Sequence, residues 1–339
     1  MDLRKNNIPK EFILSRLHSL MGLMIVIFLF EHLITNSQAA LLFGDDGAGF
    51  VRIVNLIHNL PYVQVIELTF IGVPIVYHAV IGIQKALYGR SNAFTSKEGQ
   101  KPYIPTARGR AYSLQKWTAW ILLFGIIGHV GYFRFYLYPV ETKEANKRMF
   151  FTKVNFDPGL YGLQDRLGFS LYSSEAIIQY KSELDKEEAY EELADQRIRE
   201  IEGQESGFNE EMSQLAKQKN KMEEMQHFYA ALTERTLEKN QVILVTDSFG
   251  TSQLMNVRDV FKSPIKAVLY TIFVIAAVFH GFNGLWAFTI TWGLVVKQVS
   301  QRRMLKLCMG MMFLLGFLGL SAVWGTYWVN LRSKGRLWK

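Results

Sequence analysis

The sequence LHSLMGLMIVIFLFEHLITN, residues 17–36, is apolar over a length that can cross a lipid bilayer. A membrane-spanning helix needs about 20 mainly apolar residues. Four later stretches also reach that length, at residues 65–87, 114–138, 265–296 and 304–328. We therefore expect an all-α membrane protein with five transmembrane helices and with its termini on opposite sides of the membrane.

Each of the first four apolar stretches carries a histidine well inside it: His32, His78, His129 and His280. Ionisable side chains at membrane depth are costly and usually functional, and imidazole is a common ligand of haem iron. At a rise of about 1.5 Å per residue, His32 and His129 fall in the outer half of the membrane, and the other two in its middle or inner half. The pattern predicts two bis-histidine pairs, His78 with His280 and His32 with His129, and hence a five-helix bundle that binds two haems.

Two other interpretations use the same histidines. They can form interhelical hydrogen bonds in a purely structural anchor without haem, or serve as relays in a proton-coupled transporter. A transporter is expected to have inverted repeats and helices broken by Gly or Pro, and the sequence lacks both. The single cysteine, Cys308, excludes a Cys-x-x-Cys-His haem attachment and an intrachain disulfide. Any haem is therefore non-covalent and of the b type.

Basic residues predict the orientation. Basic residues gather before the first apolar stretch, between the second and third stretches, and between the fourth and fifth stretches. Positive charge is typical of cytoplasmic loops, so we place these three segments in the cytoplasm. The residues are, in that order, Arg4, Lys5, Lys10 and Arg16; Lys85, Arg90, Lys97, Lys101, Arg108 and Arg110; and Lys297, Arg302, Arg303 and Lys306. The basic C-terminal tail conflicts with this rule.

The start of the chain resembles a cleavable leader, but its apolar part is too long for one, so we expect it to be retained. The net charge of +8 suits anionic lipid or a partner subunit better than nucleic acid.

The chain divides into three predicted segments. Residues 1–157 carry helices 1–3 and an N-terminal cytoplasmic segment, residues 158–256 form an extracytoplasmic and mostly helical insertion, and residues 257–339 carry helices 4–5 and the tail. In the insertion, residues 174–202 and 209–240 predict a helical hairpin around a Gly-containing link at 203–207. Residues 241–247 predict a strand, with 169–172 as its candidate partner. No motif assigns the insertion a reaction, so a solvated structural excursion or a partner-binding element is expected.

Several motifs at the helix ends resemble a known family. They are SRLHSLMG at 15–22, EHLITNS at 31–37, YHAVIG at 77–82, HGFNGLW at 280–286, TWG at 291–293 and SQRR at 300–303. In order and spacing they resemble the five-helix, di-haem cytochrome b558 subunits of bacterial succinate:quinone oxidoreductases. The resemblance covers about residues 10–157 and 255–330. The segment between them departs from the family, where a short connection is usual.

The resemblance implies that the four histidines above are the axial ligands, with the pairing already inferred. It also implies a flavoprotein and an iron–sulfur subunit docked on the cytoplasmic face of the bacterial cytoplasmic membrane, with menaquinone as the lipid substrate. The chain is then no enzyme on its own. It is the electron-transfer and anchor subunit of succinate dehydrogenase, in electron transport and the tricarboxylic acid cycle, and contributes the quinone site. A quinol:fumarate reductase, which runs the same path backwards, is the alternative.

Four further residues are candidates for the cofactor and quinone sites. Arg16, His18 and Ser19 lie at the cytoplasmic end of the first helix, where haem propionates or a quinone carbonyl need hydrogen-bond donors; contact with lipid headgroups explains them equally well. Glu67 lies eleven residues outward of His78, which is about 16 Å along a helix. It is a candidate proton acceptor for quinol oxidation, or alternatively a charge that complements the helix dipole.

Overall fold

The structure is a computed structural model of the chain, and it describes residues 9–40, 45–88, 107–144, 147–201 and 208–335. The chain divides into two compact units. We call the first the membrane unit, which comprises Met1–Phe50, Leu56–Tyr132 and Ser263–Trp328. We call the second the sheet unit, which comprises Val51–Asn55, Phe133–Lys262 and Val329–Lys339. Some predicted features fall outside the described residues, namely Arg4, Lys5, Arg90, Lys97, Lys101, the link at 203–207, and Arg336 and Lys339 of the basic C-terminal tail.

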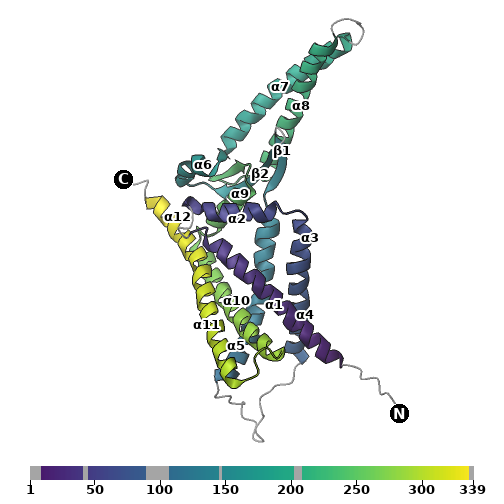
Figure 1. The fold of residues 1–339 in the computed structure, drawn as a ribbon. Helices are drawn as coiled ribbons and strands as arrows, with labels where there is room; N and C mark the ends of the chain where they lie inside the picture. Colours follow the sequence, from purple (N-terminus) through teal and green to yellow (C-terminus); the bar gives the residue numbers. More distant parts are fainter. Residues whose placement is uncertain (1–8, 41–44, 89–106, 145–146, 202–207, 336–339) are drawn as a thin grey trace, which may run out of the picture. The chain divides into compact units, whose positions relative to one another are not determined.

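Within the described part of the chain, five helical segments are long and apolar enough to cross a membrane. This confirms the predicted all-α membrane class and its five spans. In chain order the segments are α1 (Lys10–Ser37); α3 (Val63–Glu67), η2 (Leu68–Gly72) and α4 (Val73–Tyr88); α5 (Ala107–Val130) and η3 (Gly131–Tyr136); α10 (Pro264–Thr291); and α11 (Gln298–Leu320), η5 (Ser321–Gly325) and α12 (Thr326–Gly335) (Figure 1).

The ends of α10 follow from its local sequence. Ser263 caps the start, because its hydroxyl accepts a hydrogen bond from the backbone N–H of Lys266 and Pro264 occupies the first helical position. The helix ends at Thr291, and Gly293 then adopts a φ of 70°, which glycine reaches without strain. The fourth span therefore ends five residues before the predicted limit at residue 296.

Helix α10 lies at the centre of the membrane unit and packs against α1, α5 and α11. Val26, Phe282 and Leu315 are among the buried residues of the cluster that joins α1, α10 and α11. Outward-facing apolar side chains such as Ile27 and Phe124 are exposed, as a lipid-facing surface requires. Helix α4 in turn packs against α1, so the four histidine-bearing helices belong to one bundle.

The sheet unit is built on four antiparallel strands in the order β1-β2-β4-β3. The strands are β1 (Val140–Glu144), β2 (Lys147–Asn155), β3 (Phe169–Tyr172) and β4 (Gln241–Thr246). The predicted pairing of 169–172 with the strand that begins at 241 is confirmed, with Phe169 opposite Thr246. The strands β1 and β2 were not predicted, and the sheet begins at Val140, whereas the predicted insertion begins at residue 158.

Helices cover both faces of this sheet. On one face α7 (Ser174–Ile201) and α8 (Phe208–Thr233) pack against each other as the predicted hairpin (Figure 1). Phe151, Phe228 and Leu232 belong to the buried cluster beneath that hairpin. The opposite face packs against η4 (Pro158–Leu160), α6 (Tyr161–Leu167) and α9 (Phe249–Val260). Helix α8 ends at Thr233, seven residues before the predicted limit, and Asn240 enters β4 with a φ of 66°.

The link between the first and second spans contains η1 (Asp45–Gly47) and α2 (Ala48–His58). No helix was predicted there, because eleven residues fall well short of a membrane span. Residues Val51–Asn55 of α2 belong to the sheet unit. There the Asn55 side chain donates a hydrogen bond to Ser248 Oγ over 2.9 Å and accepts one from the Gly250 backbone N–H over 2.6 Å. Within the sheet unit, these bonds fix the segment Val51–Asn55 to the start of α9.

Candidate functional site

The four predicted histidines lie in the membrane unit as two pairs. The rings of His32 on α1 and His129 on α5 have centroids 5.7 Å apart and planes at 87°. The rings of His78 on α4 and His280 on α10 have centroids 6.2 Å apart and planes at 82°. We call these the outer pair and the inner pair. They are the pairs that the depth argument predicted; their role as ligands stays a prediction.

A third imidazole lies beside the inner pair. The ring of His18 on α1 stacks on that of His78, with centroids 4.0 Å apart and an interplanar angle of 9°. The backbone oxygen of His18 is also 3.0 Å from Nδ1 of His78. Gly22, one turn further along α1, faces the same ring, and a Cβ placed there would lie 3.0 Å from Cε1 of His78. The absence of a side chain at Gly22 is therefore what lets α1 approach His78.

Helix α5 anchors His280 at two points. The Thr118 hydroxyl oxygen lies 3.2 Å from Nδ1 of His280, and the same hydroxyl lies 2.8 Å from the backbone oxygen of Leu114, to which it donates. One turn earlier, Nε2 of Gln115 donates to the backbone oxygen of His280 over 3.1 Å. The amide of Asn283 in turn donates to Gln115 Oε1 over 2.8 Å. Both the ring and the backbone of His280 are thus held by α5.

The surroundings of His129 are aromatic. Its Nδ1 atom lies 3.1 Å from the Tyr270 hydroxyl, and its ring is 5.8 Å from the ring of Phe273. One turn before Tyr270, Lys266 Nζ donates to the hydroxyl of Tyr132 over 2.8 Å and lies 4.9 Å from the centroid of that ring. A phenol can either donate or accept, so the contact with Tyr270 holds the His129 ring without by itself fixing which nitrogen carries the proton.

The remaining predicted residues of the membrane unit occupy different settings. The guanidinium of Arg16 lies 4.9 Å from the ring centroid of Phe12 and 5.3 Å from that of Trp292, which matches its interpretation as an interfacial cation. Ser19 is half-buried on α1, next to His18. Glu67 is the last residue of α3, immediately before the π-helical turn η2, and is half-buried. Single π-helical turns are frequent at functional sites.

Three residues that contact the pairs were not predicted: Gln115, Thr118 and Tyr270. Each acts on a histidine of another helix, so nothing in its own neighbourhood along the chain marks it. The signal that would have found Thr118 and Tyr270 is depth, because each hydroxyl lies level with a histidine on the neighbouring helix. Among the described residues, no group of three or more His, Cys, Asp or Glu side chains is arranged to hold a metal ion.

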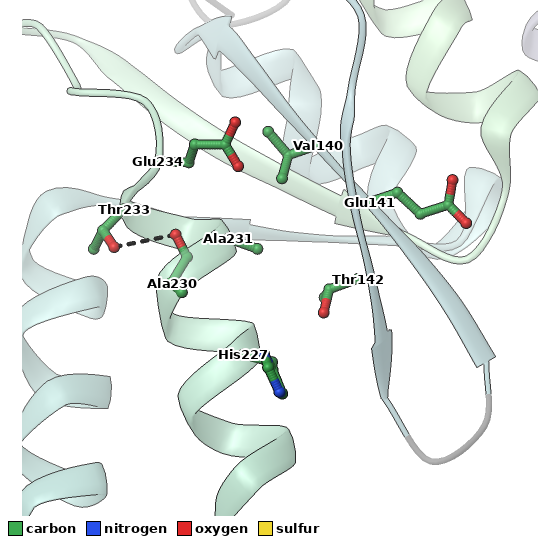
Figure 2. Close-up of a pocket in the computed structure, with 8 residues that line it drawn as sticks. All are labelled: Val140, Glu141, Thr142, His227, Ala230, Ala231, Thr233 and Glu234. Carbon is green, nitrogen blue, oxygen red and sulfur yellow. Dashed lines mark hydrogen bonds between the residues drawn. The ribbon is translucent and has the colours of Figure 1, made fainter.

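The sheet unit has a groove of about 440 Å³ between β1 and the end of α8 (Figure 2). It is lined by Val140, Glu141, Thr142, His227, Ala230, Ala231, Thr233 and Glu234. The carboxylate of Glu141 lies 3.8 Å from Arg148. The groove is open and gives no reason to assign a reaction to the sheet unit.

Comparison with known proteins finds a relative for nearly the whole chain. Over 315 residues the chain is 22% identical to the succinate dehydrogenase cytochrome b558 subunit of Bacillus subtilis (strain 168), and the alignment covers 93% of this chain and 96% of that protein. No protein-family model matches the chain, and no solved structure matches it. The comparison confirms the resemblance that the helix-end motifs predicted.

Proposed function

We propose that this chain is the di-haem cytochrome b subunit and membrane anchor of a succinate:quinone oxidoreductase. The observation that carries the proposal is that four histidines from four helices lie as two pairs. Within each pair the two ring planes are nearly perpendicular. The similarity to the Bacillus subtilis subunit supports it independently. In this role the chain is the electron-transfer and anchor part of a larger enzyme, and succinate does not bind to it.

The spacing within each pair fits a haem iron between the rings. Imidazole nitrogens bind first-row metals such as zinc at about 2.0–2.1 Å, so His32 with His129, and His78 with His280, would each have room to hold one haem through its iron. The observed separations are 5.7 Å for the outer pair and 6.2 Å for the inner pair. The haem macrocycle supplies the other ligands of its iron, so each site needs only two protein side chains.

When bound, b haems supply one-electron carriers between the iron–sulfur centres of a partner subunit and a lipid quinone. The residues of this chain hold the imidazoles in place and keep water away. Val26, Leu33 and Phe282 belong to the buried apolar cluster of α1, α10 and α11, and α1 and α10 carry His32 and His280. Ligation would join α4 to α10 and α1 to α5, so that cofactor binding also stabilises the bundle.

The orientation that we propose rests on charge, and the partners are those that the resemblance implies. The basic turn from Lys297 to Lys306 and the basic N-terminus belong on the cytoplasmic side of the bacterial membrane, where the flavoprotein and iron–sulfur subunits would dock. Menaquinone is the substrate that we assign to the outer pair, with Glu67 as its proton acceptor. The sheet unit is then extracytoplasmic. In sealed right-side-out vesicles protease should cleave within α7 and α8; protection there, with cleavage in inverted vesicles, would reverse the orientation.

A difference spectrum tests the proposal. The purified, folded chain is reduced with dithionite, and the spectrum of the oxidised form is subtracted. We expect a b-type haem spectrum that persists through size-exclusion chromatography. A folded chain that shows no haem absorption after expression with adequate haem supply would contradict the proposal. That result would favour a structural anchor or a transporter that uses the same histidines as relays.

A further inference from the structure

Helices α5 and α10 contact each other's histidines in a reciprocal way. Helix α5 carries His129 of the outer pair, and its Thr118 contacts His280 on α10. Helix α10 carries His280 of the inner pair, and its Tyr270 contacts His129 on α5. Thr118 precedes His129 by eleven residues and Tyr270 precedes His280 by ten. Because the two helices are antiparallel, this matched spacing brings each hydroxyl level with the histidine of the opposite helix.

The geometry around Thr118 favours one tautomer of His280. A hydroxyl has one proton, and that of Thr118 is within reach of two backbone oxygens of its own helix, Leu114 at 2.8 Å and Gln115 at 3.1 Å. When the proton is donated to either of these, the Thr118 oxygen accepts from Nδ1 of His280, 3.2 Å away. With its proton on Nδ1, neutral His280 presents the Nε2 lone pair as the only ligand atom. The Thr118 side chain is only 9% exposed, so little water competes for this bond.

Tyr270 supplies the corresponding contact for His129, over 3.1 Å. If His129 binds iron through Nε2, its proton resides on Nδ1 and is donated to the phenolic oxygen. The ring of Phe273 lies 5.8 Å from that of His129 and 6.0 Å from that of Tyr270. These contacts restrict rotation of the imidazole. The two pairs thus have the same type of anchor with different chemistry, an alcohol for the inner pair and a phenol for the outer pair.

We propose that Thr118 and Tyr270 are positioning residues that orient His280 and His129 as haem ligands and set the redox potentials of the two haems separately. This inference rests on the proposed di-haem function. A hydrogen bond from Nδ1–H to an oxygen increases the basicity of the ligating nitrogen and so stabilises oxidised iron. Removal of either hydroxyl should therefore raise the midpoint potential of the haem bound by that histidine and leave the other haem unchanged.

Three variants of the purified full-length protein test the proposal: Thr118→Val, Thr118→Ser and Tyr270→Phe. Valine keeps the branched shape of threonine without its hydroxyl, and serine keeps the hydroxyl. The readouts are haem content, a spectroelectrochemical redox titration and the low-spin ferric EPR signals. The inner haem is identified as the component that is absent from His280→Ala.

We expect Thr118→Val to raise the potential and change the EPR signal of the inner haem only, or to lose that haem selectively, with Thr118→Ser close to the wild type. Tyr270→Phe should change the outer haem only. The inference is overturned if Thr118→Val and Tyr270→Phe keep both haems with unchanged potentials, if each shifts both haems equally, or if Thr118→Ser behaves like Thr118→Val. A wild-type chain without haem would instead overturn the proposed function, so the two failures are distinguishable.

Discussion

The backbone oxygen of His18 lies 3.0 Å from Nδ1 of His78, and the two imidazole rings stack with centroids 4.0 Å apart. A carbonyl only accepts hydrogen bonds, so Nδ1 of His78 carries the proton and Nε2 is available as a ligand. Helix α1 therefore contributes to both levels of the membrane unit. It provides His32 to the outer pair and orients His78 in the inner pair.

Substitution of a predicted ligand should remove one haem and spare the other. Axial ligation is what retains a haem that has no covalent attachment, so His78→Ala and His280→Ala should each lose the inner haem and keep the outer one. His129→Ala should lose the outer haem and keep the inner one. Haem content and redox titration of the purified variants measure this, with His227→Ala, an exposed histidine of the sheet unit, as the control. A His280→Ala protein with both haems and full quinone reductase activity would refute the pairing.

Gly22→Ala should disturb the inner pair through a steric contact. The added Cβ would lie 3.0 Å from Cε1 and 3.2 Å from Nδ1 of His78, which is closer than ordinary packing allows. Overpacking of this kind typically costs about 1–3 kcal/mol, so we expect weaker retention of the inner haem and a lower thermal midpoint for haem loss. Gly310→Ala is the matched control, because a Cβ at Gly310 meets nothing within 4 Å. Equal behaviour of the two variants would show that His78 tolerates the contact.

Glu67→Gln should slow turnover with quinone by removing a proton acceptor while preserving size. General acid–base groups typically contribute about 10²–10⁴-fold to rate, so a loss of at least about tenfold is expected. Haem content and succinate oxidation with a soluble acceptor should be unchanged in the assembled complex. Normal quinone turnover would reduce Glu67 to a charge at a helix end. If quinone inhibitors shifted only the spectrum of the inner haem, the quinone site would belong beside Arg16, His18 and Ser19.

In the sheet unit, burial and the nearby carboxylate of Glu224 raise the pKa of Glu144. Burial and Glu144 in turn raise the pKa of Tyr180 to about 12. The folded state binds the Glu144 proton more tightly than the unfolded state does. The free energy of unfolding therefore falls as the pH rises from the pKa of Glu144 in the unfolded chain, about 4.3, through its raised pKa in the folded protein.

Glu144→Gln should therefore stabilise the sheet unit at pH 7. The gain should stay below about 1 kcal/mol, because this half-exposed carboxyl interacts through solvent, and it should vanish below about pH 4. Hydrogen–deuterium exchange of β2 amides, corrected for the intrinsic rate at each pH, measures the opening free energy. Glu141→Gln on the same strand removes a carboxylate that lies 3.8 Å from Arg148 and should give no such gain. Identical protection in Glu144→Gln and the wild type at pH 7 would disprove the effect.

The sequence was sufficient for the five spans and for both histidine pairs, because span length and depth along a helix depend only on local sequence. The pairing of β3 with β4 was also predictable, since β4 is an uninterrupted β-branched and apolar run. Strands β1 and β2 were missed because their charged residues, such as Lys143 and Lys147, mask the alternation. Thr118 and Tyr270 were missed because their partners lie on another helix, and contacts of that kind depend on tertiary packing.

The most direct test of the central claim is the number of b haems per polypeptide. The purified protein is converted to its pyridine haemochrome for haem quantitation, and the polypeptide is quantified by amino-acid analysis of the same sample. Our account predicts two haems per chain, one for the pair His32 and His129 and one for the pair His78 and His280. A ratio of one or zero in a folded, haem-replete preparation would contradict it.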